Sequence, residues 1–202
     1  MLAAIKHGLI NLFNFQGRDA RQAFWFYVLF VYLITMAISM AVSMPMTMQT
    51  MMIGVQQGMA NARNPDQAAS EATMHAAIAA SIGKFMPLLL WAGIASATIL
   101  LVGLAASFVR RLHDSNLSGW WALIPGALQA FNLAILPGQF SNVEKMMNAS
   151  MSGDPTASFV AMQGSFSAGA VAGWAAIIAV IIFGVRKSTD GANRYGDAPF
   201  TA

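Results

Sequence analysis

The segment Val109-Arg110-Arg111-Leu112-His113-Asp114-Ser115-Asn116-Leu117-Ser118-Gly119-Trp120-Trp121 decides the architecture of this chain. Its polar part, residues 110–118, lies between two long apolar runs, with an arginine pair at one end and a tryptophan pair at the other. Charged side chains are costly to place in hydrocarbon. We therefore expect a tight loop that joins two membrane helices on one side of a bilayer.

The composition is that of a membrane protein. Of 202 residues, 57% are hydrophobic and 9% are charged, whereas soluble domains carry about 25% charged residues. The absence of cysteine excludes disulfides, thiolate metal sites and thiol catalysis. The net charge of +3 is too small to indicate a nucleic-acid partner. No removable signal peptide is expected, because residues 1–12 lack a basic n-region and a cleavage site.

The apolar runs predict an all-α membrane protein, a four-transmembrane-helix bundle in a single integral membrane domain, residues 1–202. About 20 apolar residues cross a bilayer, and the predicted spans are residues 24–44, 86–109, 119–137 and 164–185. The stretches 45–85 and 138–163 are predicted to be outer loops. Within the first of them, the alanine-rich residues 68–85 are expected to be helical and to continue into the second span near Pro87. Residues 2–13 have apolar side chains at helical spacing, which predicts a short amphipathic N-terminal helix on the membrane surface; packing on the core is the alternative.

Small residues at four-residue spacing predict close helix packing. Gly93 and Ala97 provide this spacing in the second span, and Ser165, Gly169 and Gly173 provide it in the fourth. Gln129 and Asn132 in the third span are interpreted as interhelical hydrogen-bonding groups. The ladders also favour other membrane protein subunits or a homo-oligomer as partners, alongside membrane lipids.

The distribution of basic residues predicts the orientation. Four spans place the N-terminus, residues 110–118 and the C-terminal tail on one side, with eight basic residues: Lys6, Arg18, Arg21, Arg110, Arg111, Arg186, Lys187 and Arg194. The other side has three, Arg63, Lys84 and Lys145. Because cytoplasmic segments are enriched in Lys and Arg, we expect both termini to be cytoplasmic (N-in/C-in).

Three motifs at the predicted cytoplasmic boundaries resemble one known family. They are residues 15–25 (FQGRDARQAFW), Arg110-Arg111-Leu112-His113-Asp114 with Ser118-Gly119-Trp120-Trp121, and Gly191-Ala192-Asn193-Arg194-Tyr195-Gly196. Together they are similar to the domain-of-unknown-function 805 family of small bacterial inner-membrane proteins. The resemblance implies a multi-pass protein of the bacterial inner (cytoplasmic) membrane, and it implies no activity. The long outer stretches and their methionines depart from the family pattern.

The cytoplasmic arginines form the first candidate site. Guanidinium groups bind phosphates and carboxylates, so a lipid-headgroup or anionic-ligand site is one hypothesis, with the residues Arg18, Arg21, Arg110, Arg111, His113, Asp114 and Arg194. The alternative is that these arginines set the topology and pair with Asp19, Asp114 and Asp190 to lock the loops together. Adjacent His113 and Asp114 are interpreted as turn and cap residues rather than an acid–base pair, and no catalytic residue is assigned.

The methionines form the second candidate site. Met46, Met48, Met51 and Met52 lie close together in the sequence, and thioethers suit Cu(I). The alternative is apolar packing, because Met40, Met44, Met48, Met51, Val55 and Met59 follow helical spacing.

The remaining patterns favour a protein without catalytic activity. The predicted spans contain no Asp, Glu, Lys or Arg, which argues against an ion-coupled transporter. No phosphate-loop, zinc-protease or nucleophile-elbow motif is present in the sequence. We therefore expect no enzyme and no cofactor. The leading hypothesis is an accessory or scaffold subunit of a membrane complex, with anionic-ligand binding second and Cu(I) binding third.

Overall fold

Most of the described residues lie in helices. The computed structural model describes residues 1–63, 71–151, 168–197 and 199–201, and this part of the chain contains no β-strand. The helices are α1 (Leu2–Ile10), α2 (Arg21–Arg63), α3 (Glu71–Asp114), the 3-10 helix η2 (Gly119–Ala122), α4 (Leu123–Met151) and α6 (Ala168–Gly184).

Three of these helical segments are long and apolar enough to cross a membrane. They are Arg21–Arg63, Ala76–Asp114 and Gly119–Val143, and α6 is a shorter apolar helix of 17 residues. The all-α class predicted from the sequence is therefore confirmed, and the length and composition of these helices agree with the predicted membrane character. The predicted start of the fourth span, residues 164–167, lies outside the described residues.

The alanine-rich residues 68–85 were expected to be helical, and α3 confirms this from Glu71 onward. The loop structure predicted for residues 45–63 and 138–151 was wrong. Helix α2 continues through Pro45 to Arg63, α3 begins at Glu71, and α4 continues through Pro137 to Met151. Hydropathy indicates where a chain leaves hydrocarbon, but a helix of Ala, Met and Gln residues continues readily into water because these residues have high helix propensity. A proline removes one backbone hydrogen bond without necessarily ending the helix.

The described chain forms two compact units. The first unit contains residues 1–37, 94–135 and 168–202, and the second contains residues 38–93 and 136–167. Helices α2, α3 and α4 contribute one segment to each unit. The candidate cytoplasmic site belongs to the first unit, and the methionine-rich part of α2 belongs to the second.

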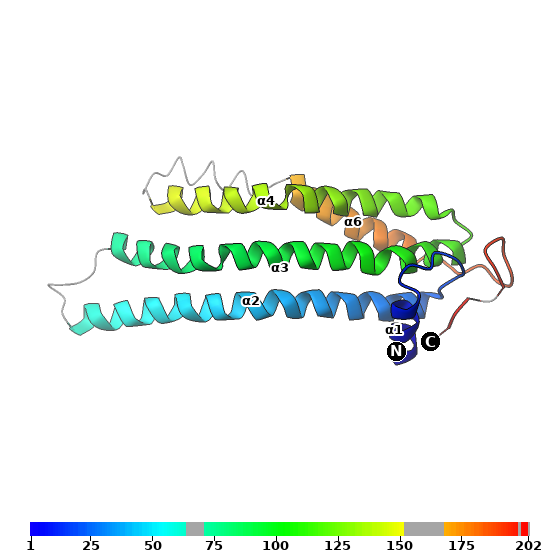
Figure 1. Cartoon of the computed structure of the whole chain (residues 1–202), viewed down its shortest axis with the longest axis horizontal. Helices are drawn as coiled ribbons and strands as arrows, with labels where there is room; N and C mark the ends of the chain where they lie inside the picture. Colours follow the sequence, from blue (N-terminus) through cyan, green and yellow to red (C-terminus); the bar gives the residue numbers. More distant parts are fainter. Residues whose placement is uncertain (64–70, 152–167, 198, 202) are drawn as a thin grey trace. The chain divides into compact units, whose positions relative to one another are not determined.

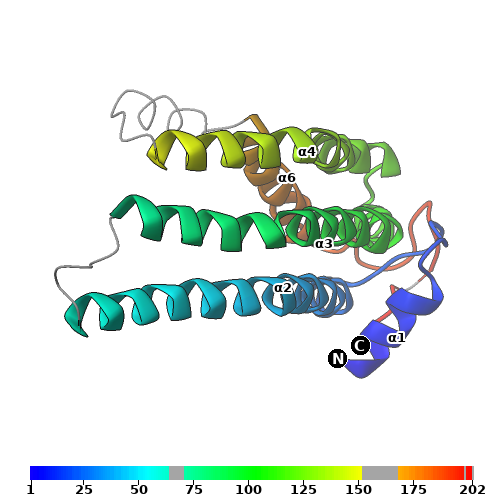
Figure 2. The ribbon, with the colours of Figure 1, turned by 60° about the vertical axis from the view of Figure 1, so that its left-hand side comes forward.

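The apolar core of the first unit lies where α2, α3 and α6 meet. Phe24, Phe108 and Leu112 are buried there, and Phe183 of α6 packs against them. The Phe108 and Phe183 rings lie 6.2 Å apart in an edge-on arrangement. This core fixes the end of α3 that carries the arginine pair beside the start of α2 (Figures 1 and 2).

Helix α1 lies across the start of α2 and packs through its smallest side chains (Figures 1 and 2). Ala4 and Gly8 are buried, and a Cβ atom at Gly8 would overlap the Tyr27 ring. The large apolar side chains of this segment are exposed instead: Leu2, Leu9, Ile10 and Phe13. The predicted N-terminal helix is present, with its apolar face open.

The predicted small-residue positions make contacts within the chain. In the first unit the Asn132 side-chain amide lies against Gly169 and Gly173. In the orientation that satisfies both of its polar atoms, its nitrogen donates to the Gly169 carbonyl oxygen (2.7 Å) and its oxygen accepts from the Gly173 amide (3.1 Å). In the second unit a Cβ atom at Gly93 would lie 3.1 Å from a methyl carbon of Leu136. Ala97 is partly buried, and Ser165 lies outside the described residues.

Candidate functional site: a buried arginine–aspartate network

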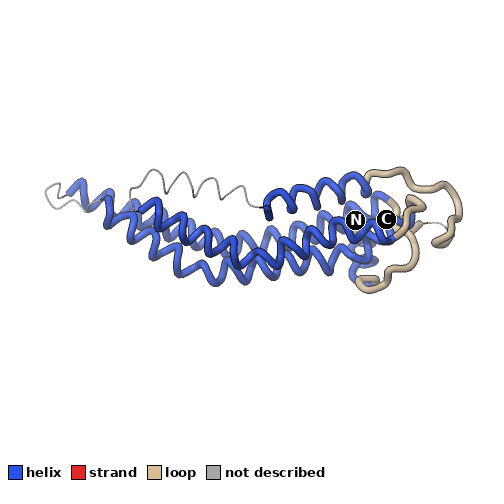
Figure 3. Tube along the Cα trace, turned by 90° about the horizontal axis from the view of Figure 1, so that it is seen from above, coloured by secondary structure: helices blue, strands red, loops and turns tan. Residues whose placement is uncertain are grey.

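Three segments distant in the sequence meet at one end of the first unit. They are the segment between α1 and α2, the end of α3, and the tail after α6. Figure 3 shows the loop segments at this end of the chain in tan, close to the two labelled chain termini. Backbone hydrogen bonds join them: the Asp19 amide donates to the Arg110 carbonyl (3.2 Å), and the Phe200 amide donates to the Arg18 carbonyl (2.9 Å).

Asp114 is the centre of the first ion cluster. Its Oδ1 accepts from Arg18 Nη2 at 3.1 Å and from Arg18 Nε at 3.3 Å. Its Oδ2 accepts from Nη1 of Arg111, one helical turn earlier. The exposed fraction is 0% for both Asp114 and Arg111 and 5% for Arg18. A buried charge persists only with partners of this kind.

The remaining guanidinium donors of this cluster hold the C-terminal tail. Arg18 donates to the carbonyl oxygens of Gly191 (2.6 Å), Thr189 (2.7 Å) and Asp197. Arg111 donates to the carbonyl oxygens of Gly184 (3.0 Å) and Arg186. These bonds turn two arginine side chains into cross-links between the tail and the helices.

Asp19 is the centre of the second ion cluster. Its Oδ1 accepts from Arg110 Nε at 3.0 Å and lies 3.0 Å from His7 Nε2. Its Oδ2 accepts from Ser107 Oγ at 3.0 Å. The His7 ring also stacks on Phe200, with centroids 3.9 Å apart. One carboxylate, just before the start of α2, thus joins α1 to α3.

An aromatic contact covers the outer side of the network. His113 stacks on Tyr195 with ring centroids 3.8 Å apart. The Arg194 guanidinium lies 4.7 Å from the Tyr195 centroid and donates to the Asn116 carbonyl at 3.2 Å. Asn193 Nδ2 donates to the His113 carbonyl at 2.9 Å. The tail motif therefore folds onto the turn that follows α3.

The structure brings most of the predicted site residues together, in two clusters and one aromatic contact. Arg18, Arg111 and Asp114 share one cluster, Arg110 belongs to the other, and His113 and Arg194 both contact Tyr195. Arg21 is exposed at the first residue of α2. A lipid-headgroup role would therefore depend on exposed Arg21 and Arg194, because the three buried guanidinium groups bind the chain itself.

Some partners differ from those expected or were not identified from the sequence. The predicted pairing of an arginine with Asp190 was wrong, since Asp190 pairs with exposed Lys187 at 3.3 Å. His7, Ser107 and the tail carbonyl groups were not assigned to the site. A role for His7 was only weakly indicated by its place in α1, next to the small residues Ala4 and Gly8 that are buried. Backbone carbonyl acceptors leave no signal in side-chain identity.

The methionine candidates do not all share one face of α2. Met48, Met51 and Met52 are exposed, whereas Met46 is half-buried and lies about 200° around the helix from Met48 at 100° per residue. Among the described residues, no group of three His, Asp or Glu side chains is placed to hold a metal ion.

The fold and the network together define an all-helical protein with helices long and apolar enough to cross a membrane. Buried ion pairs join its N-terminal segment to α3, and arginine hydrogen bonds hold its C-terminal tail. Residues 12–197 match the family model described as "Protein of unknown function (DUF805)", and the chain belongs to this family. Comparison with the curated proteins and with the solved structures finds no match.

Proposed function

We propose that this protein is a non-enzymatic accessory or scaffold subunit in the bacterial inner membrane. The observation that carries the proposal is the asymmetry of α6. Its small residues Gly169, Ala172, Ala176 and Gly184 are buried within the chain. Its large apolar residues are exposed: Val171, Trp174, Ile177, Ile178, Ile181 and Ile182. An exposed apolar helix face is available to lipid and to the helices of a partner.

The network supports a structural role for the arginines. Both carboxylate oxygens of Asp114 accept from guanidinium donors, and those of Asp19 accept from Arg110 and from the Ser107 hydroxyl. Arg18 and Arg111 use their remaining donors mainly on carbonyl oxygens. Groups bound in this way cross-link segments and have little capacity left for a substrate. We infer that the network holds both chain ends as one rigid surface on which a partner can dock.

The proposed topology is a four-helix bundle with both termini in the cytoplasm. The network supports placing the N-terminal segment, the end of α3 and the tail on the same side of the membrane, because all three are in contact through it. The excess of Lys and Arg in these segments makes that side cytoplasmic. In this arrangement the exposed Leu2, Ile10 and Phe13 place α1 in the inner interface of the bilayer.

Labelling of single cysteines tests this topology, and the chain has no native cysteine to remove. We expect Asn116→Cys and Ala192→Cys to react with a membrane-impermeant maleimide only after the inner membrane is permeabilised. Arg63→Cys, at the opposite end of α2, is expected to react in intact spheroplasts. Labelling of Asn116→Cys in intact spheroplasts would overturn the orientation.

Photo-cross-linking tests the scaffold role. A benzoylphenylalanine residue in place of exposed Trp174 is expected to form adducts with discrete polypeptides in native membranes, detected by mass spectrometry. The control is the same replacement at Phe183, which faces the core on the same helix and is expected to form no intermolecular adduct. Adducts with lipid alone at Trp174, Ile178 and Ile182 would refute the scaffold proposal.

A further inference from the structure

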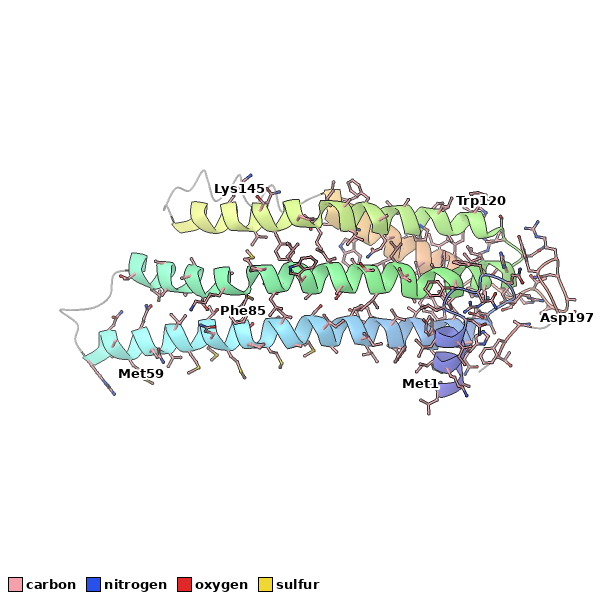
Figure 4. The ribbon with its side chains drawn as sticks, viewed as in Figure 1. Met1, Met59, Phe85, Trp120, Lys145 and Asp197 are labelled. Carbon is pink, nitrogen blue, oxygen red and sulfur yellow. The ribbon has the colours of Figure 1, made fainter. Side chains whose placement is uncertain are left out.

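The exposed methionines of α2 form a continuous stripe that the scaffold proposal does not explain. In the second unit, Met40, Met44, Met48, Met51, Met52 and Met59 are all exposed, each by 43–70%. Figure 4 shows yellow sulfur atoms along one side of α2, the helix that carries the labelled Met59. Their helical spacing is typical of a packed or an interfacial helix, and the described residues do not bury these side chains inside the chain.

We propose that Met48, Met51 and Met52 form a thioether site for a soft monovalent metal ion of the Cu(I) class. Residues three and four apart on a helix have Cβ atoms about 5–6 Å apart, so Met51 and Met52 both neighbour Met48. The exposed fractions are 67%, 70% and 61%. The side chains are therefore free to rotate their three flexible bonds until the sulfur atoms converge on one ion.

The choice of methionine over leucine supports a role for the sulfur atom. An apolar helix face needs only hydrophobic side chains, and leucine would serve as well. Between Leu33 and Leu88 the sequence contains no leucine, although it contains ten methionines, from Met36 to Met86. Thioethers are soft ligands that select Cu(I), whereas aliphatic side chains offer no donor atom.

The length of α2 places this site in water under the proposed topology. Met48 follows Arg21 by 27 residues, which is about 40 Å along a helix, whereas the hydrocarbon core is about 30 Å thick. If Arg21 lies at the cytoplasmic boundary, the triad lies beyond the outer boundary, where an ion arrives without crossing hydrocarbon. This location rests on the proposed topology; metal binding itself does not.

Competition with a chromophoric Cu(I) chelator tests the site on the purified full-length protein in detergent, under anaerobic reducing conditions. The triple variant M48L/M51L/M52L preserves apolar character and helix propensity. We expect it to bind Cu(I) at least about tenfold more weakly, the lower end of what a lost supporting group costs a metal site. The matched control is M36L/M59L/M86L, which removes three methionines from outside the triad and is expected to bind Cu(I) as the wild type does.

Two outcomes would overturn the proposal. One is a wild-type affinity no greater than that of free methionine. The other is equal binding by the triad variant and the control, which would mean that the stripe serves as an apolar contact for lipid or a partner. Neither outcome affects the Trp174 cross-linking result, so failure of the metal site and failure of the scaffold role are distinguishable.

Discussion

Replacing Asp114 by asparagine is expected to lower the free energy of unfolding of the first unit by about 3–5 kcal/mol, the usual cost of removing one partner from a buried ion pair. The substitution keeps the volume but removes the charge that balances Arg18 and Arg111. Both guanidinium groups remain in a site from which water is excluded, since Asp114 and Arg111 are fully buried. The variant should also release the tail, because the Thr189 hydroxyl donates to the backbone carbonyl of Asp114. We expect this bond to be lost when the ion cluster around Asp114 loses its carboxylate.

Two measurements check this expectation. Unfolding of the purified protein in mixed micelles, followed by tryptophan fluorescence against the fraction of denaturing detergent, reports the loss of stability. Limited proteolysis reports release of residues 186–201. The matched control is Asp190→Asn, whose carboxylate pairs with Lys187 while 88% exposed, and which is expected to leave both measurements unchanged. Equal losses in the two variants would show that burial of the ion pair is not what stabilises the corner.

The helices were predictable from hydropathy as elements, but their ends were not. The apolar runs that start at Phe24 and Met86 do lie in helices, yet α2 continues to Arg63 and α3 begins at Glu71. A bilayer boundary changes the solvent around a helix without breaking its backbone hydrogen bonds. The residues become more polar after Pro45 while α2 continues, so this change of composition was mistaken for a change of conformation.

The charged residues of the site could be predicted to lie close together, but only some of the ion pairs between them could be predicted. Helix geometry alone makes Arg111 and Asp114 neighbours three residues apart. Arg18 with Asp114 and Arg110 with Asp19 are two of several pairings that the same charges allow. The choice among them depends on how the tail closes over α3. The tail is held by its backbone carbonyl oxygens, such as that of Gly191. Because every residue has a backbone carbonyl, the sequence does not indicate which ones are used.

The role of the small-residue ladder changed in a similar way. Four-residue spacing predicts a close approach, but it does not say whether the approaching helix belongs to the same chain. Here Asn132 of α4 contacts Gly169 and Gly173. The ladder thus supports internal packing, and the argument for a partner moves to the opposite face of α6, around Trp174.

Two glycine substitutions in α6 are expected to have opposite effects on stability. At Gly184 a Cβ atom would lie 2.9 Å from Phe24 Cε1 and 2.9 Å from Trp25 Cζ2, and Phe24 is fully buried. Gly184→Ala is therefore expected to destabilise the first unit by about 1–3 kcal/mol, as overpacking does. At Gly173 a Cβ atom would lie 3.5 Å from the nearest atom, in the side-chain amide of Asn132, which is an ordinary contact. Gly173→Ala is expected to stabilise by up to about 1 kcal/mol through helix propensity.

The same unfolding measurement decides between these expectations, with each variant serving as the control for the other. The effect at Gly184 should extend to the network, because the carbonyl oxygen of Gly184 accepts from Arg111 Nε at 3.0 Å. Movement of α6 away from Phe24 would carry that oxygen away from the guanidinium group. Gly184→Ala combined with Asp114→Asn should then cost less than the sum of the two single changes. Strict additivity would mean that the aromatic core and the ion network stabilise the fold independently.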